Sequence, residues 1–388
     1  NEYIEAALDA FKLRASPVNI NFRYVEDELR YLFDDADLVA LVYHREFAPR
    51  VAAVARSVPS LRTFIEVDDG SSVGAPAPEY ESALAAASPV RDFPERSGQD
   101  LYLIYTGGTT GMPKGVMWRH EDVFFAGLQG GNPGGPDITE PGQLGLAARE
   151  RAAPPATLPV APLMHGNGHW ASMIGLHGGG KVVLAQKRRL DPHEIWSLVE
   201  REQANVVSIV GDAMARPLAD ALYEPDVAYD LSSLLVLTSA GALFSDDVKE
   251  KLRAKLGNTL IIDAFGMSEA GHQGMNLGRN AGGKLRFSVE GFTAVLDDDL
   301  RRVEPGAGKV GIVVGAAIGG VAALDGSRLR DVERLALGDA FGDVEHHDVA
   351  QFLEADQMGQ GAADVASANQ CDLFACHRRT SMLWVSER

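Results

Sequence analysis

One loop of this chain gathers residue types that can bind a polyphosphate, and it reads Thr106-Gly107-Gly108-Thr109-Thr110-Gly111-Met112-Pro113-Lys114-Gly115. Its ten residues include four glycines, three threonines and one lysine. Glycines allow the backbone to come close to a ligand and to turn its N–H groups towards an anion. Threonine hydroxyls and a lysine ammonium add donors and positive charge. The loop therefore predicts a phosphate-binding site.

The loop differs from a Walker A loop, in which the lysine is followed by a serine or threonine that holds magnesium. Here Lys114 is followed by Gly115. The apolar run 101–105 predicts a buried strand before the loop, 115–118 predicts a short strand after it, and the region from 120 predicts a helix. A solvated surface turn is the simpler interpretation, but it would not explain why a strand, a Gly/Thr loop and a lysine occur together.

A second candidate site is the segment Asp263-Ala264-Phe265-Gly266-Met267-Ser268-Glu269. We expect a strand to end near residue 264 and a helix to begin around 268. The ring of Phe265 can then cover a purine face, and the hydroxyl of Ser268 can reach a phosphate at the helix N-terminus, where the helix dipole favours anions. Glu269 can hold a hard cation that bridges phosphate oxygens. The alternative is that Ser268 and Glu269 only cap the helix.

A third segment, Thr238-Ser239-Ala240-Gly241-Ala242-Leu243, follows an apolar run that predicts a strand. Small residues at the end of a strand permit the close approach of a flat ligand. A tight turn from strand to helix, capped by Ser245, explains the same residues equally well. The sequence alone leaves both interpretations open.

A fourth segment contains two histidines and reads Pro162-Leu163-Met164-His165-Gly166-Asn167-Gly168-His169-Trp170. His165 and His169 are spaced for one face of a helix, so a metal pair has to be considered. Gly166 and Gly168 disfavour a helix there, and no glutamate or third histidine lies nearby to complete the site. We therefore expect no metal at these histidines.

These segments can act together only if the fold brings them to one place. Short apolar runs predict further strands at 18–20, 38–43, 181–184, 206–210, 234–238 and 260–264. Helical spacing predicts helices at 3–13, 25–33, 47–58, 192–202, 212–222 and 245–256. This alternation indicates an α/β fold built from βαβ units around a mostly parallel sheet. Ligands bind beyond the carboxyl ends of such strands, which is where the first two candidate sites lie.

Composition limits the classes of function. The chain has 388 residues, 46% of them apolar, which suffices for a large core. Its 36 basic and 54 acidic residues give a formal charge of −18, which argues against a nucleic-acid binder. A nucleotide site must therefore be built locally, from backbone N–H groups and a few cations. We expect no transmembrane segment, and the two cysteines, Cys371 and Cys376, fit a reducing compartment such as the cytoplasm. With His377 they make an incomplete zinc signature.

The loop and the residues after it, Val116-Met117-Trp118-Arg119, resemble the phosphate-binding signature of the adenylate-forming enzymes. This superfamily contains acyl-CoA synthetases, luciferases and nonribosomal adenylation domains, and the resemblance is greatest to bacterial fatty-acyl-CoA synthetases. It implies the family's large N-terminal domain, with stacked, mostly parallel sheets and helices between them. It also implies ATP, Mg²⁺ and CoA as cofactors or co-substrates, and a small carboxylic acid as substrate.

The resemblance also implies roles for individual residues. Thr106, Thr109, Thr110 and Lys114, with the loop glycines, would hold the β- and γ-phosphates of ATP. Segment 263–269 is similar to the family's aromatic-Gly-x-Thr-Glu motif, with Ser268 in place of threonine and Phe265 in place of the commoner tyrosine. Ser268 would orient the α-phosphate, Glu269 would bind Mg²⁺, and Phe265 would lie against adenine, with Asp263 and Gly266 beside it. Gly241 and Ala242 resemble the family's Gly-Gly-Ala segment, which lines the adenine site and the acyl tunnel. His165 matches a histidine at the mouth of the acyl pocket.

The resemblance covers residues 1–308, which would be an AMP-binding large domain that lacks its opening part. Residues 309–388 form an atypical tail without the family's Tyr-x-Thr-Gly-Asp segment and small C-terminal domain, and its only lysine is Lys309. Residues 324–340 are compatible with a helix, although the segment lacks a clear strand–helix rhythm. The tail is interpreted either as a shifted reading frame or as a divergent ending.

Two alternatives to a fatty-acyl-CoA synthetase stay open. One is an adenylate-forming enzyme for an aryl or amino acid, although 162–176 offers no acidic residue to meet an amine. The other is a catalytically incomplete fragment that binds nucleotide or acyl groups. The oligomeric state is left open.

Overall fold

The computed structural model describes residues 1–73, 77–107 and 112–279, and beyond them the strand segments 285–289, 293–296, 311–317, 320–329, 333–335 and 381–386. The chain forms two compact units. The first unit contains Asn1–Glu121, Pro162–His169 and Arg378–Arg388. The second unit contains Asp122–Ala161 and Trp170–His377.

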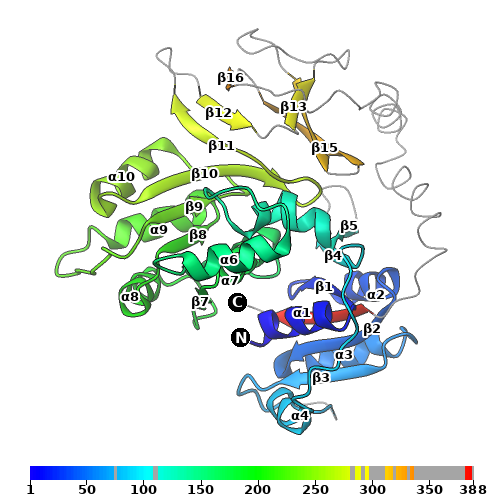
Figure 1. Ribbon diagram of the computed structural model, residues 1–388. Helices are drawn as coiled ribbons and strands as arrows, with labels where there is room; N and C mark the ends of the chain where they lie inside the picture. Colours follow the sequence, from blue (N-terminus) through cyan, green and yellow to red (C-terminus); the bar gives the residue numbers. More distant parts are fainter. Residues whose placement is uncertain are drawn as a thin grey trace. The chain divides into compact units, whose positions relative to one another are not determined.

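The first unit is built on a sheet with the strand order β3-β2-β17-β1-β4-β5, as far as the structure describes it. These strands are β1 (Ser16–Asn21), β2 (Leu38–His44), β3 (Thr63–Val67), β4 (Leu101–Thr106), β5 (Lys114–Arg119) and β17 (Ser381–Ser386). All neighbours are parallel except β4 and β5, which form an antiparallel pair. Strand β17, drawn in red in Figure 1, lies between β1 and β2.

The helical elements of the first unit are α1 (Glu2–Lys12), α2 (Glu26–Asp35), the 3₁₀ turn η1 (Arg45–Phe47), α3 (Ala48–Ala55), α4 (Tyr80–Ala86) and the single turn α5 (His120–Asp122), whose last residue belongs to the second unit. Helix α2 begins where the Glu28 carboxylate accepts a hydrogen bond of 2.8 Å from the Val25 N–H, which satisfies one of the donors left open at a helix start. Its apolar face places Leu32 and Phe33 in the core beside strand β2.

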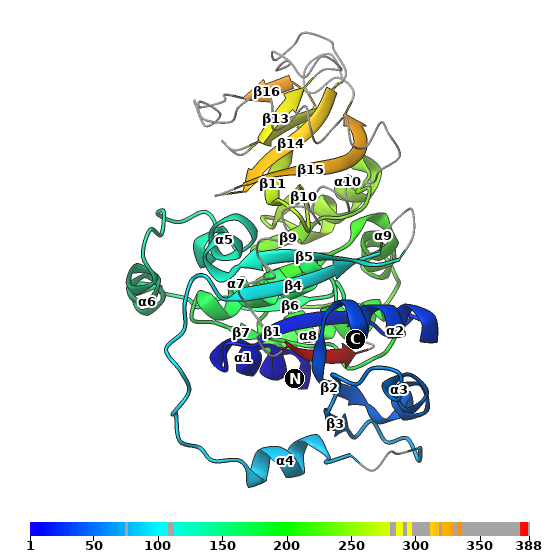
Figure 2. The same ribbon diagram turned by 90° about the vertical axis from the view of Figure 1, so that its right-hand side faces the viewer.

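The second unit is built on a sheet with the order β16-β12-β11-β10-β9-β8-β6-β7 in the described residues. These strands are β6 (Ala156–Pro159), β7 (Lys181–Val182), β8 (Val206–Ile209), β9 (Val236–Ser239), β10 (Leu260–Met267), β11 (Gly271–Arg279), β12 (Leu285–Val289) and β16 (Glu333–Leu335). Strands β10 to β12 pair antiparallel, and the others pair parallel. A smaller antiparallel sheet is formed by β13 (Thr293–Leu296), β14 (Gly311–Ala317) and β15 (Gly320–Leu329), which lie side by side in Figure 2.

The helical elements of the second unit are the π-helical turn η2 (Val123–Gly127), the 3₁₀ turn η3 (Gln129–Gly131), α6 (Pro141–Glu150), α8 (Pro192–Glu202), α9 (Gly211–Ala221) and α10 (Asp246–Leu256). Helix α8 starts at Pro192 because the Asp191 carboxylate accepts bonds from two backbone N–H groups, and it ends at Gln203, which has a left-handed backbone (φ 52°). Trp196 on its inner face is fully buried in the main core of the unit.

The described elements confirm the α/β alternation and the mostly parallel sheets expected from sequence. The helix considered for 324–340 is not found in the described part of that segment: from 324 the chain belongs to strands β15 and β16, and the rest of 324–340 lies outside the described residues. Backbone pairing with β14 and β12 decides its conformation, and a local helical pattern does not reveal such pairing. In the part of the chain that the structure describes, no helix has the length and apolar character needed to cross a bilayer.

Candidate functional site

The base of the Gly/Thr loop is an antiparallel strand pair. Thr106, the last residue of β4, lies opposite Lys114, the first residue of β5. Thr106 is half-buried, whereas Gly107 and Lys114 are exposed. A hydroxyl and an ammonium therefore stand side by side where the loop leaves the sheet. Gly108, Thr109, Thr110 and Gly111 lie outside the described residues.

Tyr105 fixes this strand pair from the inside. Its ring is 4% exposed, and its hydroxyl donates a hydrogen bond of 2.6 Å to the Asp35 carboxylate. Burial and this acidic partner raise the pKa of Tyr105, so the hydroxyl stays protonated. Gly115 faces the ring, and a Cβ at Gly115 would lie 2.9 Å from a ring carbon. Gly115 is thus needed for packing against Tyr105, a role that the glycine count of the loop did not suggest.

The segment after β6 forms a helix, contrary to the expectation from its glycines: α7 runs from Gly166 to His177. Gly166 and Gly168 occupy only its first turn, where a glycine weakens few helical hydrogen bonds, and Ala171, Met173 and Leu176 favour the rest of the helix in spite of Gly175. His165 immediately precedes α7 and is exposed. Partial loss of water around the ring and the positive charge of Arg23 lower the pKa of His165, so the ring is neutral at neutral pH.

His169, the other histidine of this segment, is 3% exposed and lies at contact distance from two tyrosines. Its Nδ1 is 3.4 Å from the Tyr3 hydroxyl, and its ring meets the rings of Tyr3 and Tyr102 edge to face. Burial lowers the pKa of His169 to about 4. Its surroundings are those of a neutral core histidine.

In the second unit, the small-residue segment 238–243 and the segment 263–269 begin in the neighbouring parallel strands β9 and β10. Ser239 at the end of β9 pairs with Asp263 in β10, so both chains continue beyond the same edge of the sheet. Gly241 and Ala242 are exposed there. Their loop is held to the start of α9, because Asp212 donates its N–H to the Leu243 carbonyl at 2.8 Å.

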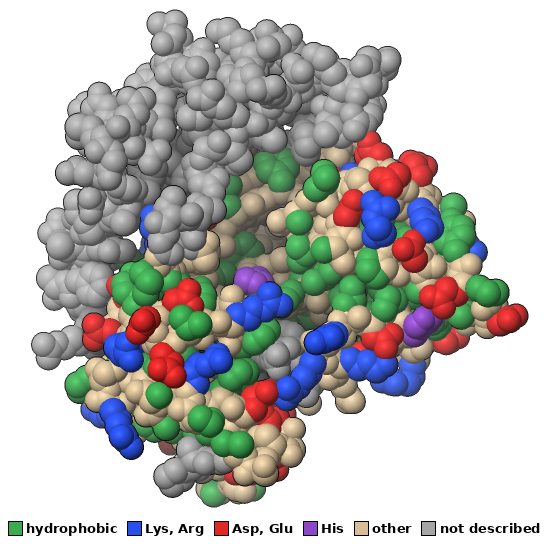
Figure 3. All heavy atoms as spheres, turned by 180° about the vertical axis from the view of Figure 1, so that it is seen from behind, with side chains coloured by type: hydrophobic (Ala, Val, Ile, Leu, Met, Phe, Trp, Pro, Cys, Tyr) green, Lys and Arg blue, Asp and Glu red, His purple; other side chains and the backbone are tan. Residues whose placement is uncertain are grey.

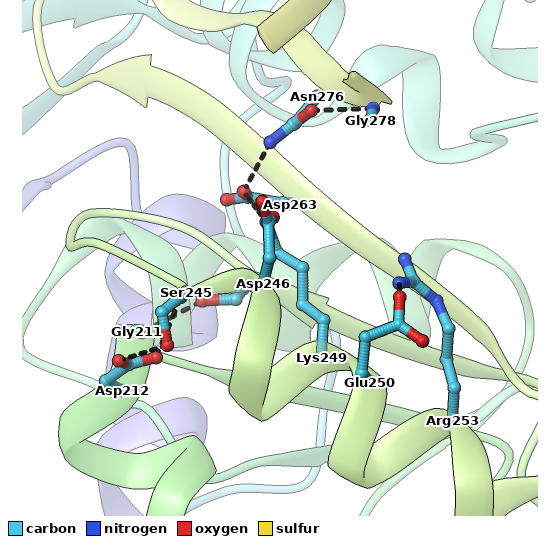
Figure 4. Close-up of polar contacts among 11 residues, drawn as sticks. Gly211, Asp212, Ser245, Asp246, Lys249, Glu250, Arg253, Asp263, Asn276 and Gly278 are labelled. Atoms are coloured by element: carbon cyan, nitrogen blue, oxygen red, sulfur yellow. Dashed lines mark hydrogen bonds and ion pairs between the residues drawn. The ribbon is translucent and has the colours of Figure 1, made fainter. Parts of the chain in front are cut away.

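The same loop is closed by Ser245, whose hydroxyl and N–H both donate to the Asp212 carboxylate, at 2.6 and 2.9 Å (Figure 4). Ser245 precedes α10 without capping it through its own side chain. The expected cap at Ser245 is therefore replaced by a bond to the neighbouring helix α9. This bond fixes the position of the Gly241–Ala242 turn relative to the sheet.

Asp263 has two polar partners inside the second unit (Figure 4). Its carboxylate receives a bond of 2.6 Å from the Lys249 ammonium and one of 3.0 Å from the Asn276 amide. Lys249 is 5% exposed and also lies 3.6 Å from Asp246. A buried ammonium needs such partners, because its desolvation is costly. In this structure Asp263 is thus the counter-ion of the buried Lys249 ammonium.

Ser268 and Glu269 lie in a hairpin and not at the start of a helix. Strand β10 continues through Phe265 and Gly266 to Met267, a turn follows at 268–270, and β11 runs back antiparallel. Gly271 has φ +73°, and a Cβ there would lie 2.6 Å from the Ala126 carbonyl oxygen. The chain thus reverses where a helix was expected, and Ser268 lies in a turn and not at a helix N-terminus.

The turn still offers ligands for a cation. Ser268 and Glu269 are adjacent and half-buried, so a hydroxyl and a carboxylate lie in the turn of the hairpin. Mg²⁺ prefers oxygen ligands and commonly uses one or two carboxylates together with substrate phosphates. The oxygen atoms of this turn are of the type that such an ion takes, and Glu269 would be its protein ligand.

The predicted residues thus fall into two groups. Thr106, Gly107, Lys114 and His165 belong to the first unit, whereas Gly241, Ala242, Asp263, Phe265, Gly266, Ser268 and Glu269 belong to the second. Sequence reasoning missed the residues that hold these segments in place, namely Asn19, Asp35, Asp212 and Lys249. Each is a polar side chain inside an element that reads as ordinary core or helix, and only its contacts distinguish it.

Charge on the described surface is mixed. On the face shown in Figure 3, Lys and Arg side chains and Asp and Glu side chains are both visible among the coloured residues. Binding of a polyanion would depend on local groups such as Lys114 and the loop backbone.

Known proteins resemble this chain in sequence. Residues 1–316 match the family described as AMP-binding enzyme. A 3-oxocholest-4-en-26-oate–CoA ligase of Rhodococcus rhodochrous is 43% identical over 326 residues, which are 80% of this chain and 58% of that protein. A medium/long-chain-fatty-acid–CoA/3-oxocholest-4-en-26-oate–CoA ligase of Mycobacterium tuberculosis (strain ATCC 25618 / H37Rv) is 45% identical over 319 residues, again 80% of this chain and 58% of that protein. The chain thus spans less than two thirds of the length of these relatives.

Solved structures resemble it in fold. The anthranilate CoA ligase AuaEII in complex with anthranoyl-AMP matches with a TM-score of 0.60 at 19% identity, over 82% of this chain and 64% of that one. The N-terminal domain of FACL13 from Mycobacterium tuberculosis matches with a TM-score of 0.61 at 21% identity, over 83% and 77%. These structures show that the fold is shared, and the sequence matches show the family. With its match over residues 1–316 and identities of 43% and 45% to these ligases, the chain belongs to the AMP-binding enzyme family.

Proposed function

We propose that this chain carries the ATP-binding and acid-binding part of an acyl-CoA synthetase, an acid–thiol ligase that activates a hydrophobic carboxylic acid, with a fatty acid as the expected substrate. The observation that carries the proposal is the pairing of Thr106 with Lys114 at the base of a Gly/Thr-rich loop. It gains support from relatives more than 40% identical whose names are those of CoA ligases.

The reaction would proceed in two steps. A carboxylate oxygen of the acid attacks the α-phosphorus of ATP, and the bond to pyrophosphate breaks. The thiol of CoA then attacks the acyl carbonyl carbon of the adenylate, loses its proton, and AMP leaves. The first step is limited by positioning and by the repulsion of negative charges. It therefore needs local positive charge close to the phosphates.

Individual residues have proposed roles in that first step. Thr106, Thr109, Thr110 and Lys114, with Gly107, Gly108 and Gly111, would hold the β- and γ-phosphates. Glu269 would bind Mg²⁺, which supplies charge neutralisation when bound, and Ser268 would orient the α-phosphate. Phe265 with Gly266, Asp263 and the Gly241–Ala242 turn would form the adenine side. His165 would stand at the mouth of the acyl pocket as a neutral ring.

The domain organisation remains a proposal. We assign residues 1–308 to the AMP-binding large domain and 309–388 to a tail outside the family's small C-terminal domain. The chain covers 58% of the length of a related CoA ligase, and CoA transfer by this chain is part of the proposal. A cytoplasmic location remains a prediction from the cysteine content.

We propose the chemical class of the substrate acid, a hydrophobic carboxylic acid. The names of the relatives mention fatty acids and a steroid acid, and both classes are hydrophobic carboxylic acids. Segment 162–176 carries no acidic side chain that would meet an amine, which disfavours amino acids. The alternative from another class is a fragment that binds nucleotide or acyl groups without catalysis.

ATP–pyrophosphate exchange distinguishes these functions. The chain would be incubated with Mg²⁺, ATP, labelled pyrophosphate and a panel of fatty, steroid, aryl and amino acids, beside a complete ligase of the family. Exchange that depends on a fatty or steroid acid supports the proposal. Exchange with aryl or amino acids only would show that the substrate belongs to one of those classes and is not a fatty or steroid acid. ATP binding without exchange would favour the non-catalytic fragment.

A further inference from the structure

Asn19 is a buried polar residue in strand β1 whose side-chain amide is fully engaged. It is 6% exposed. Its Oδ1 accepts a hydrogen bond of 2.6 Å from the Tyr105 N–H, and its Nδ2 donates to the Tyr105 carbonyl at 3.0 Å and to the Met164 carbonyl at 2.6 Å. Turning the amide over would bring Oδ1 against two carbonyl oxygens. The contacts therefore fix the amide in a single orientation.

The two bonds from Asn19 to Tyr105 lie at the entrance to the phosphate loop. Strand β4 pairs with β1 at Val18 and Leu103, and Tyr105 follows two residues later. There the side chain of Asn19 binds both the N–H and the carbonyl of Tyr105, which leads directly to Thr106. The backbone course of the loop entrance is thus set by the Asn19 amide in addition to the strand ladder.

The bond from Asn19 to the Met164 carbonyl reaches the segment that carries His165, the histidine proposed for the mouth of the acyl pocket. Met164 is 5% exposed, and the next residue is His165. The His165 carbonyl accepts the His169 N–H at 3.1 Å, so this segment continues rigidly into the first turn of α7. A single amide group therefore joins the loop entrance and the His165 segment, two stretches far apart in the sequence.

We propose that Asn19 is a positioning residue that couples these two segments, so that occupation of the phosphate loop by Mg·ATP favours binding of the acid, and the reverse. The inference rests on the proposed function, which assigns the loop to ATP and His165 to the acyl side. A displacement of the Tyr105 backbone would be passed through the Asn19 amide to the Met164 carbonyl, because the amide is buried and bonded to both segments. By linkage, the coupling must be equal in both directions.

Two matched substitutions distinguish a role of Asn19 in coupling the two ligands from a purely structural role. Asn19→Asp keeps the shape of the side chain and the acceptor for the Tyr105 N–H, but it removes the donor to both carbonyls. Asn21→Asp makes the same chemical change two residues later in β1. There the side-chain oxygen accepts the Arg23 N–H, at 3.0 Å, as its contact within the described residues, and a carboxylate can accept it equally well.

The measured quantity is the ratio of the dodecanoate dissociation constants without and with a non-hydrolysable ATP analogue and Mg²⁺, determined by titration calorimetry on the full chain. We expect a ratio of about 5 or more for the wild type and for Asn21→Asp, and a ratio close to 1 for Asn19→Asp. A residue with only a structural role would weaken both ligands and leave the ratio unchanged, and that result would overturn the coupling while leaving the proposed function intact. A wild-type chain that binds neither ligand would overturn the proposed function and the coupling with it.

Hydrogen exchange on the wild type covers the case in which Asn19→Asp does not fold. The ATP analogue should slow amide exchange in 112–119 and also in 162–169. Protection confined to 112–119 would contradict the coupling, whereas protection of both segments without added acid supports it.

Discussion

At the scale of single residues, the candidate site depends on a few charges placed by backbone pairing. Lys114 faces Thr106 because the two strands around the loop are in register. Glu269 stands at the tip of a hairpin and has the oxygen chemistry that Mg²⁺ prefers. The Asp263 carboxylate accepts a hydrogen bond from the buried ammonium of Lys249. A charged residue in a motif can thus be held by the fold before any ligand binds.

Replacement of Lys114 or Glu269 tests the proposed phosphate and metal roles. Lys114→Ala and Glu269→Gln should each lower acid-dependent ATP–pyrophosphate exchange by about 100-fold or more, because each removes a charge that offsets the phosphates. Lys181→Ala is a matched control, since Lys181 also opens a strand and is exposed. Exchange at the wild-type rate in either site variant would remove that residue from the site.

At the scale of elements, local patterns predicted most helices and strands, and errors arose where distant contacts decide the conformation. Helix α8 was predicted with its bounds, because Asp191 and Pro192 mark its start in the sequence itself. The hairpin after β10 was predicted as a helix start, because a serine and a glutamate are also typical of a cap. What reverses the chain is the left-handed Gly271 packed on the Ala126 carbonyl, a contact with no local signature.

The buried position of His169 in α7 predicts a loss of stability in acid. Its pKa is lowered to about 4 by burial, whereas an unfolded histidine titrates near 6.5. Below about pH 6.5 the unfolded chain binds more protons than the folded one, so the free energy of unfolding falls as the pH decreases towards 4. Between pH 7 and 5 this one residue should account for about 2 kcal/mol.

Urea unfolding of the wild type and of His169→Gln at several pH values checks this. The two curves of unfolding free energy against pH should run parallel above pH 7 and converge as the pH falls to 5. Parallel curves over the whole range would show that His169 is not the titrating group.

The strand pair that carries the loop should not tolerate a larger residue at Gly115. Gly115→Ala puts a Cβ 2.9 Å from the ring of Tyr105, which is buried and tied to Asp35. Such overpacking costs about 1–3 kcal/mol of unfolding free energy. Gly142→Ala, in the first turn of α6 with open space around it, should leave stability unchanged or slightly raised. Equal stabilities for the two variants would argue against the packing role.

At the scale of the whole molecule, the α/β fold and the family could be inferred from sequence, but the pairing of the last strands could not. The alternation of strands and helices indicated the fold, and the loop at 106–115 indicated the family. Strand β17 inserts in parallel between β1 and β2, and β15 pairs with β14, so their partners are set by distant register. The residues that hold the site, such as Asn19, were hidden for the same reason.

Acid-dependent ATP–pyrophosphate exchange by this chain is the decisive measurement for the proposed function. We expect exchange with dodecanoate that exceeds the blank without acid and is lost in Lys114→Ala. A chain that binds Mg·ATP but gives no exchange with any fatty, steroid, aryl or amino acid, under conditions in which a complete ligase of the family does, would overturn the proposed function.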